Sequence, residues 1–298
     1  MTGCSVSVII PVRDEADSLG LVIAGVRRVL GADADVVVVD DGSSDESARI
    51  AVVAGARVIR HPYGMGNGAA IKTGIRHARG EGLVLMDGDG QHDPADIPSL
   101  VGLLDRYDLV VGVRARRGQA SIGRALANWL YNGLASYVTQ RRIPDLTSGF
   151  RAVRRRVVRP YLYLLPNTFS YPTTMTLAFM RSGRSVAYVP ITVHRRAGAS
   201  KIRWLADGSR FVIIIMKIAT LFAPLRVFLP VSVGCAVAGF VNYVYTFVTM
   251  HRFTNMSVLL IMTGVVVFLL GLIAEGIADL RFDRTEDGAA DDSGTVNT

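Results

Sequence analysis

The chain has 298 residues, half of them hydrophobic, and its mean hydropathy of +0.34 is high for a protein without membrane segments. Its formal net charge is +8, and its two cysteines, Cys4 and Cys235, lie far apart in the sequence. This composition excludes a small domain held together by disulfides, leaves ample apolar residues for a core, and predicts folding in a reducing compartment.

Short apolar segments alternate with helical patterns over the first 113 residues. The predicted strands cover residues 6–12, 35–41, 57–60, 83–86 and 109–113. The first segment is too short for a signal peptide and has no basic leader. Asp14 is expected to cap the helix that follows it, because apolar residues then recur at helical spacing. Strands that are apolar on both faces and alternate with helices predict an α/β fold, a doubly wound and mostly parallel sheet.

Acidic residues follow three of the predicted strands. They are Asp14, Glu15, Asp40, Asp41, Asp87 and Asp89. Ligands of such sheets bind beyond the carboxyl ends of the strands, so we expect these acids to gather at one edge. For Asp40 and Asp41 the alternative is turn formation and helix capping, and one of the two could do only that.

Residues 87–91 read Asp-Gly-Asp-Gly-Gln. The two glycines permit turns that could bring the carboxylates of Asp87 and Asp89 towards one hard cation, and Gln91 could add a neutral oxygen. A small set of oxygen ligands suits Mg²⁺ or Mn²⁺, which keep water ligands and accept phosphate oxygens. The alternative is a polar turn that binds no metal.

The middle of the chain is strongly basic, since residues 112–203 contain 17 Arg or Lys residues and one acid, Asp145. This excess predicts contact with anionic lipid headgroups or phosphates, and nucleic acid is the other explanation. The segment carries no zinc, RNP or basic-zipper signature and leads into apolar helices, so membrane lipids are favoured and nucleic acid is not. Most of these arginines are expected to face solvent or headgroups.

The last third of the chain has the pattern of a membrane anchor. Residues 227–249 carry no charge and, at roughly 1.5 Å per residue, are long enough to span a bilayer core. A second uncharged stretch follows at about 257–274. Basic residues concentrate before the first span and after the second, which predicts that both termini are cytoplasmic. Asn242 is expected to make a helix-packing contact. The predicted parts are a cytosolic domain (1–200), an interfacial amphipathic region (201–224), two transmembrane helices within 225–282 (about 227–249 and 257–279) and a disordered acidic tail (283–298).

Four segments together resemble family 2 glycosyltransferases of the GT-A fold: residues 5–15, 40–43, 86–92 and 147–151. The third reads Met-Asp-Gly-Asp-Gly-Gln-His and the fourth Thr-Ser-Gly-Phe-Arg. The resemblance covers roughly residues 5–203 and is greatest to the polyprenyl-phosphate sugar synthases. It implies a GT-A (Rossmann-like) sheet domain and a membrane-bound enzyme that moves a sugar from a UDP- or GDP-linked donor to a polyprenyl phosphate. A Gln-x-x-Arg-Trp block, typical of processive polysaccharide synthases, is absent.

The resemblance also implies roles for individual residues. Those expected to hold the nucleotide are Pro11, Asp14, Glu15, Asp40 and Asp41. Those expected to form the metal and diphosphate site are Asp87, Asp89 and Gln91. Those expected to meet the lipid phosphate or close over the donor are Arg124, Ser148, Arg151 and the stretch 195–201, which ends in Lys201.

The implied reaction is a single in-line displacement that gives a β-linked product from an α-linked donor. Asp145 is the candidate general base if one is used, and its alternative role is to cap the turn before Thr147. Two other functions stay open: transfer to a lipid alcohol such as diacylglycerol, and a non-catalytic membrane scaffold. A homo-oligomer is also open, since two short spans and an interfacial helix would pack well in one.

Overall fold

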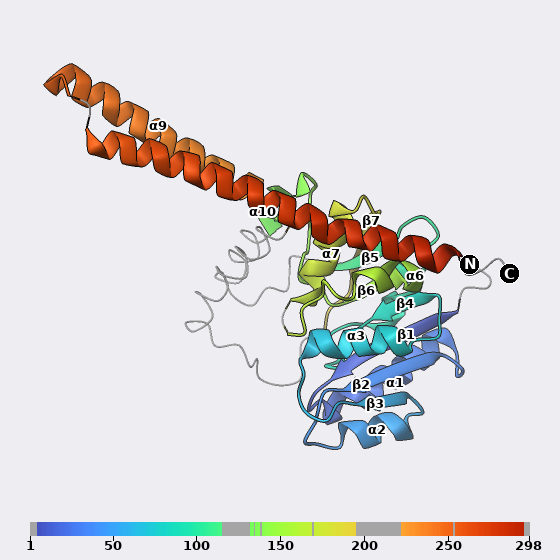
Figure 1. Cartoon of the computed structure of the whole chain (residues 1–298). Coiled ribbons are helices and arrows are strands. Elements are labelled where there is room, and N and C mark those ends of the chain that lie inside the picture. Colours follow the sequence, from blue (N-terminus) through green and yellow to red (C-terminus); the bar gives the residue numbers. More distant parts are fainter. Residues whose placement is uncertain are drawn as a thin grey trace. The chain divides into compact units, whose positions relative to one another are not determined.

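The computed structural model describes residues 5–114, 132–133, 135–137, 139–168, 170–194, 222–252 and 254–294, with the backbone alone from 281 onward (Figure 1). The chain forms two compact units. One contains residues 1–136, 141–202 and 288–298, and the other contains 137–140 and 203–287.

The first unit is built on a seven-stranded sheet with the strand order β3-β2-β1-β4-β6-β5-β7. The strands are β1 (Val6–Val12), β2 (Asp35–Asp40), β3 (Arg57–Arg60), β4 (Gly82–Leu85), β5 (Leu109–Arg114), β6 (Arg151–Arg154) and β7 (Val186–Ile191). All neighbours are parallel except β6, which runs antiparallel to both β4 and β5. The mostly parallel sheet predicted from the sequence is confirmed, whereas the sequence analysis missed β6.

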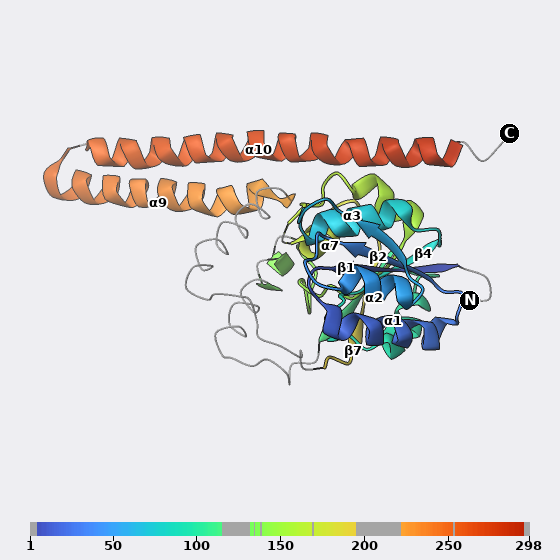
Figure 2. The ribbon, with the colours of Figure 1, turned by 90° about the horizontal axis from the view of Figure 1, so that it is seen from below.

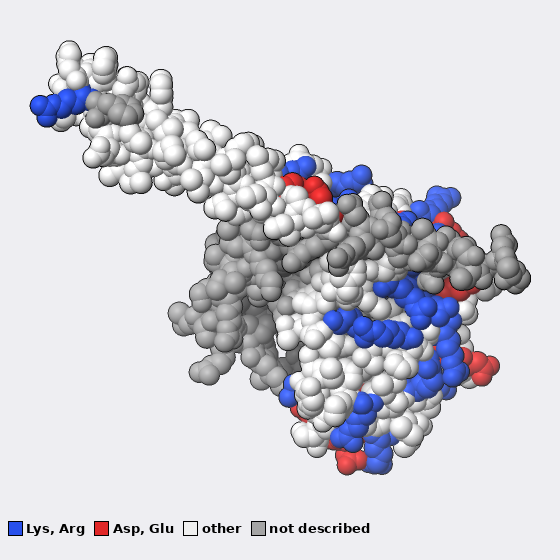
Figure 3. Space-filling view, viewed as in Figure 1, with Lys and Arg blue, Asp and Glu red and all other residues white. Residues whose placement is uncertain are grey.

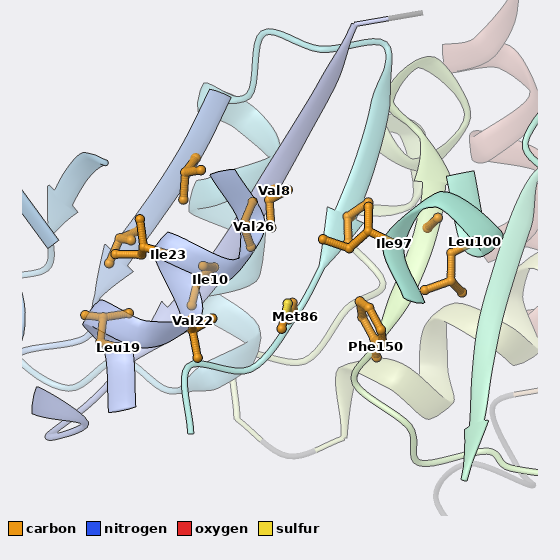
Figure 4. Close-up of a cluster of buried hydrophobic side chains, with 14 of the residues drawn as sticks. Val8, Ile10, Leu19, Val22, Ile23, Val26, Met86, Ile97, Leu100 and Phe150 are labelled. Carbon is orange, nitrogen blue, oxygen red and sulfur yellow. The ribbon is translucent and has the colours of Figure 1, made fainter. Parts of the chain in front are cut away.

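Helices cover both faces of this sheet. They are α1 (Ala16–Leu30), α2 (Ser47–Val53), α3 (Asn67–His77), η1 (Pro94–Asp96), α4 (Ile97–Val101), α6 (Arg155–Val158), η3 (Arg159–Tyr161) and α7 (Tyr171–Arg181). Figure 2 shows α3 on one face and α1 and α2 on the other. On the α1 face, Val8 and Ile10 of β1 pack with Leu19 and Ile23 of α1 in a fully buried cluster (Figure 4). This core fixes the position of the loops at the carboxyl edge of the sheet.

The predicted cap of α1 is wrong. The helix begins after Glu15, whose side chain makes no capping hydrogen bond, and the amide of Ala16 donates instead to Oδ2 of Asp45 at 3.0 Å. Asp14 has a left-handed backbone (φ 55°), and its Oδ1 accepts a hydrogen bond from the Ser44 amide at 2.8 Å. The carboxylate therefore points across to the loop after β2 and not back to its own helix.

The second unit contains the helix α9 (Pro224–Met250) and all but the last residues of the helix α10 (Asn255–Gly294). Both Pro224–Met250 and Asn255–Leu280 are long and apolar enough to cross a membrane, with mean hydropathies of 1.8 and 2.7. Asn242 donates to Ser257 Oγ at 2.9 Å, which confirms its predicted role in helix packing. The segment 201–221, predicted to be interfacial, lies outside the described residues.

The helix α10 continues past the second span to Gly294. Residues 283–294, which the sequence predicts to be disordered, are thus helical in their backbone. The segment contains no proline, and extending an existing helix requires no new nucleation step.

Candidate functional site

Three parallel strands and one antiparallel strand bring the candidate residues to one edge of the sheet. Val12 pairs with Asp40 across β1 and β2, and Ile9 pairs with Leu85 across β1 and β4. Their carboxyl ends therefore lie together. Arg151, the first residue of β6, pairs with Leu85, so the chain that precedes β6 arrives at the same edge. The gathering of the acidic strand ends predicted from the sequence is confirmed.

Asp14 and Asp40 join the loops that follow β1 and β2. Asp14 accepts from the Ser44 amide, and its own amide donates to Ser43 Oγ at 3.1 Å. Asp40 is fully buried, accepts from the Ser43 amide at 2.8 Å and forms an ion pair with Arg60 at 3.1 Å. The carboxylate of Asp40 is thus enclosed, whereas Asp14 is partly exposed.

Asp41 organises the glycine-rich loop after β3. It is 4% exposed and accepts hydrogen bonds from the amides of Met65 (2.7 Å) and Gly66 (2.8 Å). Its Oδ1 also lies 2.8 Å from Nδ1 of His61, whose Nε2 lies 3.0 Å from Thr73 Oγ1. Both carboxylates are buried and engaged by the protein, and the role of Asp40 and Asp41 in holding a nucleotide stays a prediction.

The loop after β4 carries the candidate metal ligands. Gly90 adopts φ 74°, a left-handed conformation that favours glycine, and Ser18 Oγ donates to the Gly88 carbonyl at 2.7 Å. Asp89 Oδ1 accepts from the Gln91 amide at 3.1 Å. The side chain of Asp87 is 37% exposed. The bent loop thus presents half-exposed oxygen groups at the edge of the sheet.

These residues fit a divalent cation that is bound mainly through its substrate. Among the described residues, no three His, Cys, Asp or Glu side chains cluster so that they could hold a metal ion by themselves. Asp87, Asp89 and Gln91 offer hard oxygen ligands, and Mg²⁺ and Mn²⁺ accept one or two carboxylates and complete their shells with water and phosphate oxygens. These residues do not suit a structural metal, which needs a complete set of protein ligands.

Asp145 is held in a network with the end of β5. Arg114 donates from Nε and Nη2 to its two oxygens at 2.8 and 3.0 Å, and the amides of Thr147 and Ser148 donate to Oδ1. Burial alone would raise the pKa of Asp145, but the hydrogen bonds and the charge of Arg114 outweigh it and hold the pKa below its ordinary value. The turn-capping role before Thr147 is confirmed, and a carboxylate with a lowered pKa is a weak general base.

Arg151 is fully buried behind the site. Its guanidinium donates to the carbonyls of Leu146, Ser148 and Pro172 and to Thr176 Oγ1. Burial lowers its pKa to about 10, so it remains charged at neutral pH. The described donor contacts of this side chain are with the protein, and its predicted role at the substrate stays a prediction. Arg151 shapes the segment before β6.

The segment before β6 lies directly against Asp87. A Cβ placed on Gly149 would come within 2.7 Å of Asp87 Oδ2, so a larger residue at this position would displace the carboxylate. Ser148 is 1% exposed, and its Oγ has no hydrogen-bond partner in the described part of the chain. Ser148 is thus enclosed next to Gly149, which lies against Asp87, and its implied role at the lipid phosphate or over the donor stays a prediction.

Two predicted residues, Arg124 and Lys201, lie outside the described residues, as does the rest of 195–201. Pro11 and Glu15 lie at the edge, partly exposed. Of the basic residues in the middle of the chain, Arg156 and Arg159 are exposed, as expected, and Figure 3 shows Lys and Arg side chains on the face that carries α3. Sequence reasoning assigned no role to Arg114 or His61, because a single basic residue carries no motif, and His92 entered only as the last residue of the segment 86–92.

Two family models match the chain. The model described as glycosyl transferase family 2 matches residues 7–162, and the model described as GtrB C-terminal hairpin matches residues 223–280. The first covers most of the described sheet domain, and the second coincides with α9 and the apolar part of α10.

Relatives of known name agree with these matches. The undecaprenyl-phosphate 4-deoxy-4-formamido-L-arabinose transferase of Photorhabdus laumondii is 28% identical over 300 residues, which cover 93% of this chain and 90% of the relative. The enzyme of the same name from Yersinia enterocolitica is 30% identical over 257 residues, covering 79% and 73%.

The fold also resembles a solved structure, glucosyl-3-phosphoglycerate synthase from Mycobacterium tuberculosis in complex with Mn²⁺, UDP and glucosyl-3-phosphoglycerate. The TM-score is 0.58 at 22% identity, over 72% of this chain and 78% of that one. At this identity the likeness shows the fold alone. The family 2 model matches more than half of the length of this chain, and the named relatives agree with it. This chain therefore belongs to glycosyl transferase family 2 and is a glycosyltransferase.

Proposed function

We propose that the protein transfers a sugar from a nucleotide sugar to a polyprenyl phosphate, with the aid of Mg²⁺ or Mn²⁺. One observation carries the proposal: the Asp87-Gly-Asp89 loop lies at the carboxyl edge of a family 2 sheet domain whose chain continues into a GtrB-type hairpin. The relatives named as undecaprenyl-phosphate sugar transferases support the same acceptor class.

The donor is held by the loops after β1, β2 and β4. Asp14, Glu15 and Pro11 are the partly exposed residues available to the nucleoside, while Asp40 and Asp41 keep the surrounding loops in place from beneath. Asp87, Asp89 and Gln91 would hold the cation. When bound, the ion neutralises negative charge on the leaving nucleoside diphosphate, which is electrostatic stabilisation of the transition state.

The acceptor phosphate needs little activation. Its second pKa is about 6, so an oxygen is already ionised at neutral pH. This oxygen forms the new bond to the anomeric carbon as the bond from that carbon to the diphosphate breaks, and one such displacement inverts the configuration. The lowered pKa of Asp145 supports this reaction, because an alcohol acceptor would demand a competent base.

The hairpin accounts for access to a lipid acceptor. The spans Pro224–Met250 and Asn255–Leu280 would anchor the enzyme in the cell membrane. Basic residues lie before the first span and after the second, and Arg252 is the one Arg or Lys between them. The positive-inside rule therefore supports a cytoplasmic catalytic domain with both termini on the same side.

The direct test is a transfer assay with membranes that contain the full chain. A panel of UDP- and GDP-sugars is offered with polyprenyl phosphate or diacylglycerol, and the lipid product is identified by mass spectrometry and by its lability in acid. We expect an acid-labile, phosphate-linked sugar. A diacylglycerol product would overturn the acceptor, and no product from any donor would overturn the function.

The variant D89A should lose at least ~100-fold in the rate of transfer, by analogy with removal of one transition-state stabilising group. The matched control is D105A, since Asp105 is an exposed acid outside the site. It should retain activity within about twofold. Full activity of D89A would remove the metal from the mechanism.

A further inference from the structure

His92 is a buried polar residue that the proposed reaction does not use. It is 6% exposed, and its Nδ1 has no hydrogen-bond partner among the described residues. The same nitrogen lies 4.0 Å from Oδ2 of Asp87. Buried nitrogens of this kind are nearly always hydrogen-bonded in folded proteins, so an unpaired one next to a candidate metal ligand requires an explanation.

The position of the His92 ring is fixed from two sides. The ring stacks on Phe150, with the centroids 5.1 Å apart and an angle of 24° between the planes, and Phe150 is itself fully buried. The backbone of His92 forms a β-bridge with Val193, and the neighbouring carbonyl of Gln91 accepts from the His194 amide at 2.8 Å. These contacts hold the plane of the imidazole against Phe150, beside Asp87.

The Asp87 side chain, by contrast, is 37% exposed, and Gly149, which has no side chain, lies beside its Oδ2. A separation of 4.0 Å is beyond hydrogen-bond length, and a shift of about 1 Å brings it within the usual range of roughly 2.7–3.2 Å. A small rotation of the carboxylate is sufficient.

We propose that His92 is a positioning residue that donates a hydrogen bond from Nδ1 to Oδ2 of Asp87 and so presents the other carboxylate oxygen to the cation. The proposal rests on the metal-dependent function above. Ligating carboxylates are generally oriented by hydrogen bonds from a surrounding shell of residues, and loss of such a partner typically weakens metal binding about 10- to 100-fold. The competing explanation is that His92 only packs against Phe150.

Two substitutions separate these explanations. H92F keeps the ring that stacks on Phe150 and removes the donor. H92N removes the ring and keeps an amide nitrogen close to the position of Nδ1. The dissociation constant of Mn²⁺ is measured by electron paramagnetic resonance for the full chain in detergent, in the presence of UDP and, in parallel, of GDP, which supply the phosphate ligands. Thermal melting verifies that each variant is folded.

We expect H92F to bind Mn²⁺ about 10-fold more weakly than the wild type and H92N to stay within about threefold. The matched control is H77F, because His77 is an exposed histidine at the end of α3. Its affinity should be unchanged. If H92F does not fold, H92L provides the variant without a donor, and the same expectation applies.

Affinity of H92F equal to that of the wild type would overturn the proposal, as would equal weakening in H92F and H92N. Transfer of sugar by a wild-type protein that binds no Mn²⁺ would overturn the role of His92 and leave the transferase function standing. Binding of Mn²⁺ that depends on the Nδ1 donor, without transfer to any acceptor, would support the role of His92 and count against the function.

Discussion

Arg114, the last residue of β5, forms a two-point ion pair with Asp145, with Nε 2.8 Å from Oδ2 and Nη2 3.0 Å from Oδ1. The two residues are 31 positions apart in the chain. Arg114 Nη2 also donates to Thr147 Oγ1 at 2.6 Å. This pair fastens the segment before β6 to the end of β5 and so fixes the position of that segment relative to Asp87.

The first prediction concerns D145N. The substitution keeps the shape of the side chain and removes its charge, so Arg114 loses its ionic partner. We expect the free energy of unfolding to fall by about 2 kcal/mol, less than for a fully buried pair because the Arg114 side chain is 42% exposed. Chemical denaturation measures this change. Transfer to polyprenyl phosphate should fall less than about 10-fold, and a far larger loss would indicate that Asp145 acts as a base.

The same carboxylate gives a pH dependence of stability. The pKa of Asp145 is lowered in the folded protein, so its stabilising contribution is complete above the pKa of the unfolded chain, about 3.9, and is lost as the pH falls further. The free energy of unfolding of the wild type should therefore decline more steeply than that of D145N below about pH 4. Parallel curves in that range would contradict the assignment.

A second prediction concerns the buried guanidinium of Arg151. R151K keeps the charge but cannot reach all four acceptors, which leaves buried carbonyls without donors. At about 1–3 kcal/mol for each unpaired buried group, we expect a loss of at least ~3 kcal/mol in the free energy of unfolding. R156K, at an exposed position nearby in sequence, should change it by less than about 0.5 kcal/mol. A stable but inactive R151K would instead indicate a role in catalysis.

A third prediction uses two helix glycines. A Cβ on Gly74 of α3 would lie 2.2 Å from Cγ2 of Ile9, a fully buried residue of β1. G74A should therefore destabilise the protein by about 1–3 kcal/mol through overpacking. On Gly20 of α1 the Cβ would meet Ile50 at an ordinary 3.4 Å, so G20A should stabilise by about 0.5–1 kcal/mol. Equal melting temperatures for the two variants would contradict the tight packing of α3 on β1.

A fourth prediction concerns the hairpin. A Cβ on Gly264 would lie 2.9 Å from the carbonyl oxygen of Ser232, and Ser232 Oγ donates to the Gly264 carbonyl at 2.8 Å. Small residues at such contacts let membrane helices approach closely. G264I should separate α9 from α10 and lower the melting temperature in detergent. G234I is the control, because nothing lies within 4 Å of a Cβ there, and its melting temperature should match the wild type.

The central strands could be predicted because burial on both faces requires continuous apolar residues. Thus β1 and β2 agree with the predicted segments to within one residue. The strand β6 could not be found this way, since it has four residues and an arginine at each end. One of these, Arg151, is fully buried, which is contrary to the usual behaviour of arginine.

The site was predicted in outline and not in detail. The acidic residues at the ends of the parallel strands predict that the site lies at the carboxyl edge of the sheet, because the topology brings those ends together. Which carboxylates remain accessible depends on partners that are distant in sequence. Asp41, for example, is engaged by His61 and by amides of the loop after it, 20 to 25 positions away. No local pattern reveals such a pairing.

The direction of β6 has a consequence for how this protein family can diversify. Because β6 runs against its neighbours, the connection from β5 leaves the sheet and returns to it at the same edge, and the pair of Arg114 and Asp145 closes its base. Changes in the sequence or length of a connection closed in this way therefore need not shift the register of any strand.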